Sequence, residues 1–423
     1  MIDIKDLRER PEHYKKGATS KGFDGSLIDQ VLVLDENRRK LTTLREELKA
    51  KQNILAKSVP TLTGAEKEKA LAESKDLSNQ VKKYDDDLIV AEKKLLEVAE
   101  AIPNPIHESV HLGKSDAENT VARTVGTPTK FDFKPKEHWE IAEDMDILDL
   151  ERGAKVSGSR FYYLKNDLVF LEFALVQFVM RKLTEKGFIP MITPFLVRER
   201  AMWGTGFFPA DKNEIYTVNP GEDNLFLVGT SEVTLVNYHD NEVLDSAKLP
   251  LRYVGYSSCF RREAGSYGKD MKGMIRVHQF EKVEMVSFVD PEKSWEEHEF
   301  LRECEEEILQ DLGLPYQVVN ICSGDLGASA AKKYDLEGWF PGQEKYRELT
   351  STSNTTDYQA RRLNIKYRNK EGKLELVHIL NGTATSMRPL AAIIENYQEK
   401  DGSIIVPEVL RMYMGKDKIT KLS

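Results

Sequence analysis

Leucine recurs at every seventh position early in the chain, and no other pattern in the sequence limits the fold as strongly. This heptad spacing predicts a long helix that packs one apolar seam against a second helix. Thr63, with Glu66 three residues later, has the spacing of a capping box, which predicts that a new helix begins there. The stripe consists of Leu27, Leu34, Leu41, Leu48 and Leu55, has Val31 and Leu44 near its alternate seam positions, and breaks at Val59, Pro60 and Thr61.

A second apolar stripe follows, with alternate spacings of four and three residues. Two heptad helices joined by a short turn should fold back as an antiparallel coiled coil, each about 50 Å long at a rise of 1.5 Å per residue. The other positions are mostly polar or charged, so we expect this hairpin to project from the rest of the protein as an arm. The second stripe consists of Leu77, Val81, Tyr84, Leu88, Ala91, Leu95 and Val98.

The charges of the arm are divided between its helices. The second helix has three consecutive acidic residues, Asp85, Asp86 and Asp87, whereas the first is basic. Such charges commonly do no more than solvate a coiled coil. A basic edge can also bind a phosphate backbone, so the residues alone leave both interpretations open. The basic residues are Arg38, Arg39, Lys40, Arg45, Lys49, Lys51 and Lys57.

Composition excludes several classes of protein. The chain has 423 residues, 40% of them hydrophobic, which is enough for two or three domains with a substantial core. A net charge of −9 argues against a protein that coats nucleic acid without specificity. The three cysteines lack zinc-ligand spacing, so we expect no zinc, and their small number suits a reducing cytosol. The charged N-terminus and the lack of a roughly 20-residue apolar run predict a soluble cytoplasmic protein without membrane contact.

Two prolines, Pro103 and Pro105, end the arm and begin what the sequence predicts to be an irregular linker over residues 104–135. Beyond it we expect helices over residues 138–150 and 167–186. The second of these is apolar around most of its circumference, so it should be buried in the core or against another subunit.

The segment from residue 188 to residue 196 is predicted to be an extended strand that contains Pro190 and Pro194. A proline in a strand favours a sheet edge, because it has no N–H to donate. An edge strand next to an apolar helix would suit a dimer interface.

The stretch from residue 253 to residue 288 has the pattern of a strand, a loop and a second strand. Arg261 and Glu263 lie two apart at the end of the first strand, and should therefore share a face. The loop contains Gly265, Gly268 and Gly273. Apolar residues alternate over residues 275–289, which places Arg276, His278, Phe280, Lys282 and Glu284 on one face. Such a face is usually solvated, but arginines, carboxylates and a phenyl ring together also suit an anionic, aromatic ligand such as a nucleotide.

Three further patterns carry possible chemistry. Thr230 and Glu232 precede a predicted helix, where they could cap it or bind an ammonium and a hydroxyl group. Glu348 interrupts a hydroxyl-rich strand over residues 346–354; such a run is usually a polar edge strand, but its oxygens could also bind Mg²⁺. Residues 380–398 predict a strand end, a turn of small residues and a helix opened by Pro389, with Arg388 at its N-terminus, where the helix itself favours an anion.

Nearly the whole chain resembles the bacterial seryl-tRNA synthetases, a family of class II aminoacyl-tRNA synthetases. The hairpin resembles the family's tRNA-binding arm, and GFIPMITPFLV resembles the first class II motif. CFRREAG with IRVHQFEKVEM resembles the second motif, and NGTATSMRPLAAIIENYQ the third. GTSEV, CSGDLG and YRELTSTSN with YQARRLNIKYR are further family signatures.

The resemblance implies an α+β fold, in which an antiparallel class II sheet flanked by helices follows an N-terminal coiled-coil arm. It implies an N-terminal domain over residues 1–103 with the arm at about 27–100, a linker and the start of the catalytic body over 104–135, and a catalytic domain over 136–423. The three motifs would lie at about 167–196, 253–288 and 380–398. The first motif would seal a homodimer.

The implied enzyme is a serine-tRNA ligase. Serine and ATP would give seryl-adenylate and pyrophosphate, and the seryl group would pass to tRNA-Ser bound by the arm; charging of tRNA-Sec stays open. Arg261 and Arg388 would be catalytic, and Glu348 and Ser351 would hold Mg²⁺. Serine would be bound by Thr230, Ser231, Glu232, Glu284 and Thr383. ATP would be bound by Arg261, Arg262, Glu263, Arg276, Val277, Phe280, Glu348, Leu349, Thr350, Ser351 and Arg388.

The sequence departs from the family pattern in two places. The third motif is one residue shorter than usual between Asn381 and Arg388, with Pro389 where threonine is common, and Arg262 replaces a residue that is typically small or a lysine. The alternatives are a related enzyme that loads a carrier protein, a catalytically altered RNA-binding paralogue and a structural coiled-coil protein. The arm and the absence of a cysteine cluster argue against the first, the retained arginines and carboxylates against the second, and the long remainder of the chain against the third.

Overall fold

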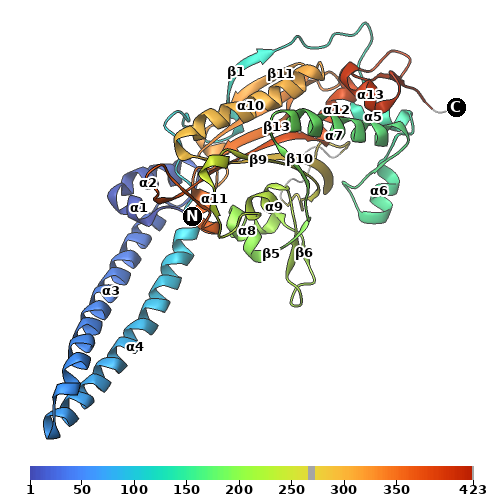
Figure 1. The fold of residues 1–423 in the computed structure, drawn as a ribbon. Coiled ribbons are helices and arrows are strands. Elements are labelled where there is room, and N and C mark those ends of the chain that lie inside the picture. The colour runs from blue at the N-terminus through green and yellow to red at the C-terminus, as the bar shows by residue number, and fades with distance from the viewer. Residues whose placement is uncertain (265–271, 422–423) are drawn as a thin grey trace. The chain divides into compact units, whose positions relative to one another are not determined.

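The computed structural model describes residues 1–264 and 272–421, so Gly265 and Gly268 of the predicted loop lie outside the described residues. The chain forms two compact units, Met1–Pro105 and Ile106–Ser423. The N-terminal unit consists of α1 (Ile4–Glu9), α2 (Pro11–Ser20), α3 (Ser26–Ser58) and α4 (Gly64–Glu100). Figure 1 shows α3 and α4 side by side as an antiparallel hairpin, which confirms the predicted arm.

The seam of the arm follows the heptad prediction with one exception. The five leucines of the first stripe are half-buried, and Val81, Ala91 and Leu95 of the second are buried. Arg45 Nε lies 2.9 Å from Asp85 Oδ1, which joins the two helices. Leu44, however, is 43% exposed and lies outside the seam, so its predicted place there was wrong. Thr63 is the residue before α4, but its side chain makes no capping hydrogen bond.

The second unit is built on an eight-stranded sheet with the order β1-β11-β12-β13-β16-β10-β9-β4. Every neighbouring pair is antiparallel except β4 and β9, which are parallel. The strands are β1 (Thr120–Val125), β4 (Ile189–Ile192), β9 (Leu251–Phe260), β10 (Gln279–Val289), β11 (Tyr316–Asn320), β12 (Lys332–Phe340), β13 (Lys345–Asn354) and β16 (His378–Ser386).

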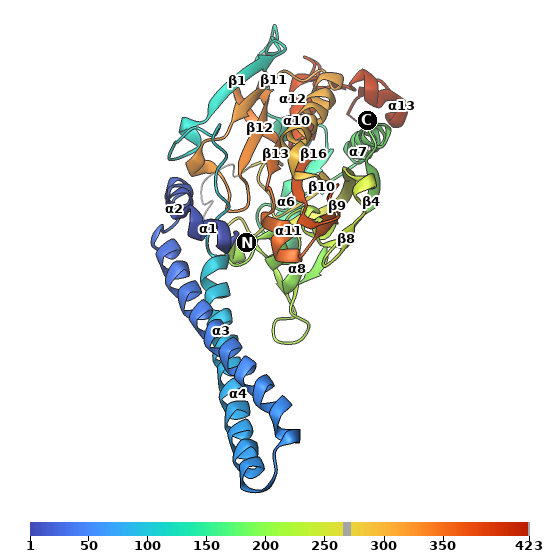
Figure 2. The ribbon, with the colours of Figure 1, turned by 60° about the vertical axis from the view of Figure 1, so that its left-hand side comes forward.

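Helices α7 (Asp167–Glu185), α10 (Ser294–Asp311) and α12 (Met387–Asn396) pack against one face of this sheet (Figure 2). The main apolar core lies between the sheet and these helices, and it includes Val283 and Met285 of β10. Because side chains alternate along a strand, Lys282 and Glu284 lie on the opposite face of the sheet. That opposite face carries the cavity described below.

Smaller elements surround the sheet. The helices are α5 (His138–Asp144), α6 (Leu150–Ser157), α8 (Glu199–Thr205), α9 (Glu232–Asn237), α11 (Tyr358–Leu363) and α13 (Arg411–Met414). The short strands are β2 (Leu148–Asp149), β3 (Tyr163–Leu164), β5 (Leu196–Arg198), β6 (Thr217–Val218), β7 (Leu225–Leu227), β8 (Val243–Leu244), β14 (Lys366–Arg368), β15 (Leu374–Leu376), β17 (Ile404–Ile405) and β18 (Lys418–Ile419).

Several predicted boundaries were wrong in the first half of this unit. Residues 120–125, predicted to be part of an irregular linker, form β1 at one edge of the sheet. The helix predicted over residues 138–150 ends at Asp144. The strand predicted over residues 188–196 is divided into β4 and β5, which belong to different sheets, although β4 does lie at an edge as predicted.

Around the cavity, three further expectations needed correction. β10 begins at Gln279, so Arg276 and His278 precede the strand, and Arg261 and Glu263 follow the end of β9. β13 is an interior strand instead of a polar edge strand. β16 runs without a turn to Ser386, and α12 begins at Met387, so Pro389 is its third residue.

Candidate active site

The open face of the sheet carries a cavity of about 470 Å³. Strands β10, β12, β13 and β16 supply much of its lining, and the segments around residues 205–211, 229–232, 261–263, 274–277 and 327–330 supply most of the rest. The start of α12 closes one side with Ser386, Met387 and Arg388. Acidic and basic side chains therefore lie together on this face of the sheet.

One end of the cavity, the acidic end, is formed by Thr230, Glu232, Glu284 and Thr383. All four are buried, with exposed fractions of 9% or less. The Thr383 hydroxyl donates a hydrogen bond to Glu284 Oε2 at 3.3 Å. Lys282 Nζ lies 2.6 Å from the same oxygen and 3.3 Å from Thr230 Oγ1. The acidic end thus holds two carboxylates, of which only Glu284 is paired with a lysine.

Glu232 is held by neutral amides. Gln359 of α11 and Asn381 of β16 both donate to Glu232 Oε1, at 2.8 Å and 3.1 Å. Burial, and then the nearby Glu284 carboxylate, raise the pKa of Glu232 to about 7. A bound ammonium group would supply the positive charge that this carboxylate lacks, so the acidic end suits a small ligand with an amine and a hydroxyl group.

The other end, the arginine end, is formed by Arg261, Glu263, Arg276, Phe280, Glu348 and Arg388. The Arg261 guanidinium lies 5.3 Å from the centre of the Phe280 ring, and Arg276 Nε lies 3.4 Å from Glu263 Oε2. Arg388 lies 2.8 Å from Glu348 Oε2. Guanidinium groups favour phosphate, and an aromatic ring and a carboxylate favour a base, so this end suits a nucleotide.

The ion pair between Arg388 and Glu348 fixes the ionisation of that carboxylate. Burial alone would raise the pKa of Glu348, but Arg388 and then Lys333 outweigh it and lower the pKa to about 2. Glu348 is therefore an anion at neutral pH, and its oxygens can accept hydrogen bonds or bind a cation.

Two β-bulges determine which side chains face the cavity. In β13, Leu349 is an extra residue between Glu348, which pairs with Glu337, and Thr350, which pairs with Leu336. Glu348 and Ser351 are three apart and would lie on opposite faces of a regular strand, but both line the cavity. In β16, Ala384 is likewise extra, so Thr383 pairs directly with Glu284.

Comparison with known proteins gave consistent matches over the chain. The family model of the seryl-tRNA synthetase N-terminal domain matches residues 1–106, and that of the class II tRNA synthetase core domain (G, H, P, S and T) matches residues 216–397. A serine--tRNA ligase of Fervidobacterium nodosum is 46% identical over 99% of both chains, and one of Pseudarthrobacter chlorophenolicus is 48% identical over 98% of both.

Solved structures agree. The seryl-tRNA synthetase of Pyrococcus horikoshii, crystallised with ATP, superposes with a TM-score of 0.95 at 40% identity over 100% of both chains. The chain belongs to the seryl-tRNA synthetase family. The prolyl-tRNA synthetase of Giardia lamblia, at 16% identity over 65% of this chain and a TM-score of 0.57, shares only the fold. The predicted class II fold is thereby confirmed.

The cavity of this seryl-tRNA synthetase family member contains most of the residues that the sequence singled out. All of the predicted serine-binding and ATP-binding residues line it except Ser231 and Arg262. Ser231 is buried, and its hydroxyl donates to the Gly255 carbonyl at 3.1 Å. The Arg262 side chain is exposed, and its backbone N–H donates to the Glu214 carbonyl. Thr350 lines the cavity, but its hydroxyl donates to Glu305 of α10.

Three residues at the acidic end were not assigned a role from the sequence: Lys282, Gln359 and Asn381. Lys282 shares the parity of Phe280 and Glu284, so the alternating pattern already placed it on the same face. Gln359 and Asn381 come from distant parts of the chain, and only the fold reveals that both contact Glu232.

Proposed function

We propose that this chain catalyses the ATP-dependent activation of L-serine to seryl-adenylate and the transfer of the seryl group to tRNA-Ser. The observation that carries the proposal is a single cavity with an amine- and hydroxyl-binding acidic end beside a phosphate-binding arginine end. The relatives are named as serine--tRNA ligases, and the similar Pyrococcus horikoshii structure was solved with ATP. Charging of tRNA-Sec stays an open extension of the same reaction.

At the acidic end, the serine ammonium group would bind Glu232 and Thr230. The serine hydroxyl would lie between Glu284 and Thr383, which are already hydrogen-bonded to each other. A site built to hydrogen-bond a hydroxyl group rejects alanine strongly, because its buried polar groups would lose their partner. Ser231 would contribute by positioning the segment between Thr230 and Glu232.

At the arginine end, Arg261 would bind the ATP α-phosphate, Glu263 the adenine amino group and Phe280 the adenine ring. Arg388 would meet the γ-phosphate or cover the other face of the adenine. Arg276, Val277, Leu349 and Thr350 line the same end and would complete the ATP site. Arg262 would assist from outside the cavity, where its side chain is exposed.

Mg²⁺ would be held by Glu348 and Ser351. The donor set fits this ion, because Glu348 is ionised, Ser351 offers a hydroxyl oxygen, and Mg²⁺ keeps waters and phosphate oxygens as its remaining ligands. When bound, the ion would neutralise phosphate charge. Among residues 1–264 and 272–421, no group of three or more His, Cys, Asp or Glu side chains could hold a metal ion by itself.

Adenylation needs no general base from the protein, because the serine carboxylate is the nucleophile. Its oxygen forms a bond to the α-phosphorus while the bond from that phosphorus to the bridging oxygen breaks, and pyrophosphate leaves. Arg261 and Arg388 would stabilise the charge that develops as the phosphorus becomes five-coordinate. The sheet and the start of α12 hold these groups in place, and such positioning provides much of the rate in this type of reaction. In the second step, a terminal ribose hydroxyl oxygen of the tRNA forms an ester bond to the seryl carbonyl carbon, the bond from that carbon to the phosphate oxygen breaks, and AMP and the hydroxyl proton are released.

The test is amino-acid-dependent ATP–pyrophosphate exchange with each of the twenty amino acids, without tRNA. Exchange with serine alone is expected. If none of the twenty amino acids supported exchange, the alternative of a catalytically altered RNA-binding paralogue would be favoured. The present arrangement argues against that alternative, because Arg261, Glu263, Glu284, Glu348 and Arg388 all line the cavity.

The arm, within an N-terminal domain over residues 1–103, would bind tRNA-Ser. Four basic residues of α3, Arg39, Lys49, Lys51 and Lys57, are exposed and form no ion pair within the described part of the chain. Deleting residues 34–95 and joining the ends should leave serine-dependent exchange nearly intact and abolish tRNA charging. Charging that survives the deletion would refute the role of the arm.

The catalytic domain over residues 136–423 would form a homodimer through its first motif. Phe170 and Phe173 of α7 and Ile189 and Ile192 of β4 are between 50% and 85% exposed in the single chain. A cluster of large exposed apolar side chains on one helix and an edge strand is characteristic of a subunit interface.

We also propose a cytoplasmic location. No helix in the described residues is long and apolar enough to cross a membrane.

A further inference from the structure

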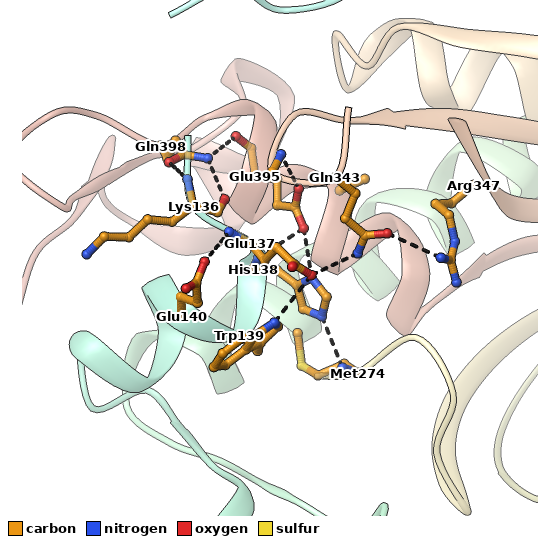
Figure 3. A network of polar contacts seen from close by, with 12 residues as sticks. Lys136, Glu137, His138, Trp139, Glu140, Met274, Gln343, Arg347, Glu395 and Gln398 are labelled. Carbon is orange, nitrogen blue, oxygen red and sulfur yellow. Dashed lines mark hydrogen bonds and ion pairs between the residues drawn. The ribbon is translucent and has the colours of Figure 1, made fainter. Parts of the chain in front are cut away.

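His138 is a buried histidine outside the cavity. It is the first residue of α5 and its exposed fraction is 0%. Its Nδ1 lies 2.9 Å from Glu395 Oε1 of α12, and the backbone N–H of Met274 donates to its Nε2 at 3.1 Å. Figure 3 shows the imidazole between Glu395 on one side and Met274 on the other. The imidazole therefore joins α12 to a segment that lines the arginine end of the cavity.

The two contacts define the tautomer of the neutral imidazole. A ring nitrogen that accepts a hydrogen bond from a backbone N–H cannot itself carry a proton. Nε2 is thus the acceptor, and in the neutral ring the proton lies on Nδ1, which donates it to Glu395. Each nitrogen of His138 therefore has one defined role.

Glu395 connects three parts of the unit. Its Oε1 also accepts the backbone N–H of His138 at 3.0 Å, which satisfies one of the free N–H groups at the start of α5. Its Oε2 accepts the backbone N–H of Gly342, in the turn between β12 and β13, at 2.9 Å. Glu395 is 0% exposed. One carboxylate thus ties α5 and α12 to the hairpin whose second strand carries Glu348.

The segment that His138 holds is also held from its other side. The carbonyl of Ile275, next to Met274, accepts a hydrogen bond from Arg388 Nε at 3.4 Å. Arg388 and Glu395 both belong to α12. His138, Met274, Ile275, Arg388, α12 and Glu395 therefore form a closed ring of contacts. Three of these residues, Met274, Ile275 and Arg388, line the cavity.

The fit between His138 and this segment is close. Gly273 has a φ of 83°, and a Cβ atom added to it would lie 2.2 Å from His138 Nε2. Next to it, Lys272 Nζ lies 4.3 Å from the centre of the Trp139 ring. Two consecutive residues of α5 thus contact three consecutive residues of the segment.

We propose that His138, held by Glu395, is a positioning residue for ATP, and that its Nε2 fixes residues 272–277 where they contact the nucleotide. The inference rests on the proposed function, because it takes the ligand of the arginine end to be ATP. His138 touches no substrate. It acts through the backbone of Met274, so losing that one hydrogen bond should weaken ATP binding.

Two substitutions separate this role from a merely structural one. In His138→Asn, the amide nitrogen can replace Nδ1 and donate to Glu395, but nothing accepts the N–H of Met274. In His138→Gln, the longer side chain can place an oxygen near the position of Nε2 to accept that N–H. Both variants should be less stable than the natural protein, but only His138→Asn loses the contact to the segment.

For His138→Asn we expect the KM for ATP in serine-dependent exchange to rise roughly tenfold, the range of one buried N–H left without an acceptor. The KM for serine should change by less than about twofold. His138→Gln should recover most of the ATP affinity. Calorimetric titration of each variant with ATP alone should give the same order of Kd values. The control is His239→Asn, a buried histidine away from the cavity that binds Tyr253 and Glu242; it should lower the Tm without changing either KM.

Equal increases of both KM values, or equal ATP Kd values for His138→Asn and His138→Gln, would overturn the inference and leave His138 a structural residue. Failure of the proposed function would look different. In that case the natural protein itself would show no serine-dependent exchange, whereas the ATP titrations would still report whether His138 affects nucleotide binding.

Discussion

Replacing Glu232 by glutamine tests the acidic end with almost no change of shape. Gln359 and Asn381 both donate to Glu232 Oε1, and the amide oxygen of a glutamine can accept both bonds. The substitution therefore retains this network and changes only the second oxygen, which becomes an NH₂ group. That group cannot accept a hydrogen bond from the serine ammonium and has no charge to attract it.

The size of the effect follows from the loss of one charge-assisted hydrogen bond. Such a bond contributes about 1.5–3 kcal/mol, which corresponds to a loss of about 10- to 150-fold in kcat/KM for serine. The KM for ATP should stay within about twofold, because Glu232 lies at the acidic end and contacts none of the residues assigned to ATP.

The pH dependence gives a second, independent signature. The pKa of Glu232 is raised to about 7, so kcat/KM for serine should increase as the pH rises through about 7 and the carboxylate ionises. Stability should change in the opposite direction. A carboxyl group whose folded-state pKa lies above its unfolded value of 4.5 binds more protons when folded, so the free energy of unfolding decreases as the pH rises from 4.5 to about 7. At 1.36 kcal/mol per pKa unit the decrease is about 3 kcal/mol.

Both signatures should disappear in Glu232→Gln. Exchange assays between pH 6 and pH 8.5 should show a flat serine profile. Thermal unfolding without serine should show a variant that gains stability over the natural protein as the pH rises from 4.5 to about 7. Glu408→Gln, at an exposed position, is the control and should match the natural protein. If Glu232→Gln raised the KM for ATP as much as that for serine, or kept the pH dependence, Glu232 would not bind the ammonium group.

Three shorter predictions address the remaining parts of the proposal. Thr383→Val removes the hydroxyl that lies 3.3 Å from Glu284, and the ratio of kcat/KM for serine over alanine should fall about 10- to 100-fold in competitive exchange assays; an unchanged ratio would exclude Thr383 from hydroxyl recognition. Glu348→Gln should raise the Mg²⁺ concentration for half-maximal exchange at least about tenfold, and an identical Mg²⁺ titration would place the ion elsewhere. Ile192→Glu puts a charge at a position that is 85% exposed in the single chain, and light scattering should report a monomer; a persistent dimer would place the interface on another surface.

Much of the fold could be predicted because the apolar spacing is regular where the elements are long. The heptads over residues 27–98 determine both helices of the arm, and the apolar run of residues 167–186 determines α7. Prediction failed where regular spacing ends. Residues 120–125 carry a mixed pattern with all but the last side chain exposed, so only their pairing with β11 makes them a strand.

Most residues of the site could be predicted from the sequence, but their spatial arrangement could not. The sequence identified Glu284 and Thr383 through family motifs, but the contact between them depends on the bulge at Ala384, which no periodicity indicates. Arg276 was expected on a strand face with Phe280. It reaches the same cavity from the segment before β10, because that segment is held by tertiary contacts to His138 and Arg388.

The bulges at Leu349 and Ala384 make the site sensitive to chain length as well as to residue identity. A strand presents every second residue to each face, so removing one residue of β13 outside the bulge would turn the residues beyond the deletion toward the opposite face of the sheet without altering any side chain. A substitution in β13 or β16 changes one side chain and therefore one contact with the ligand. A single-codon deletion outside the bulge in either strand would instead move several cavity-lining side chains to the opposite face of the sheet at once.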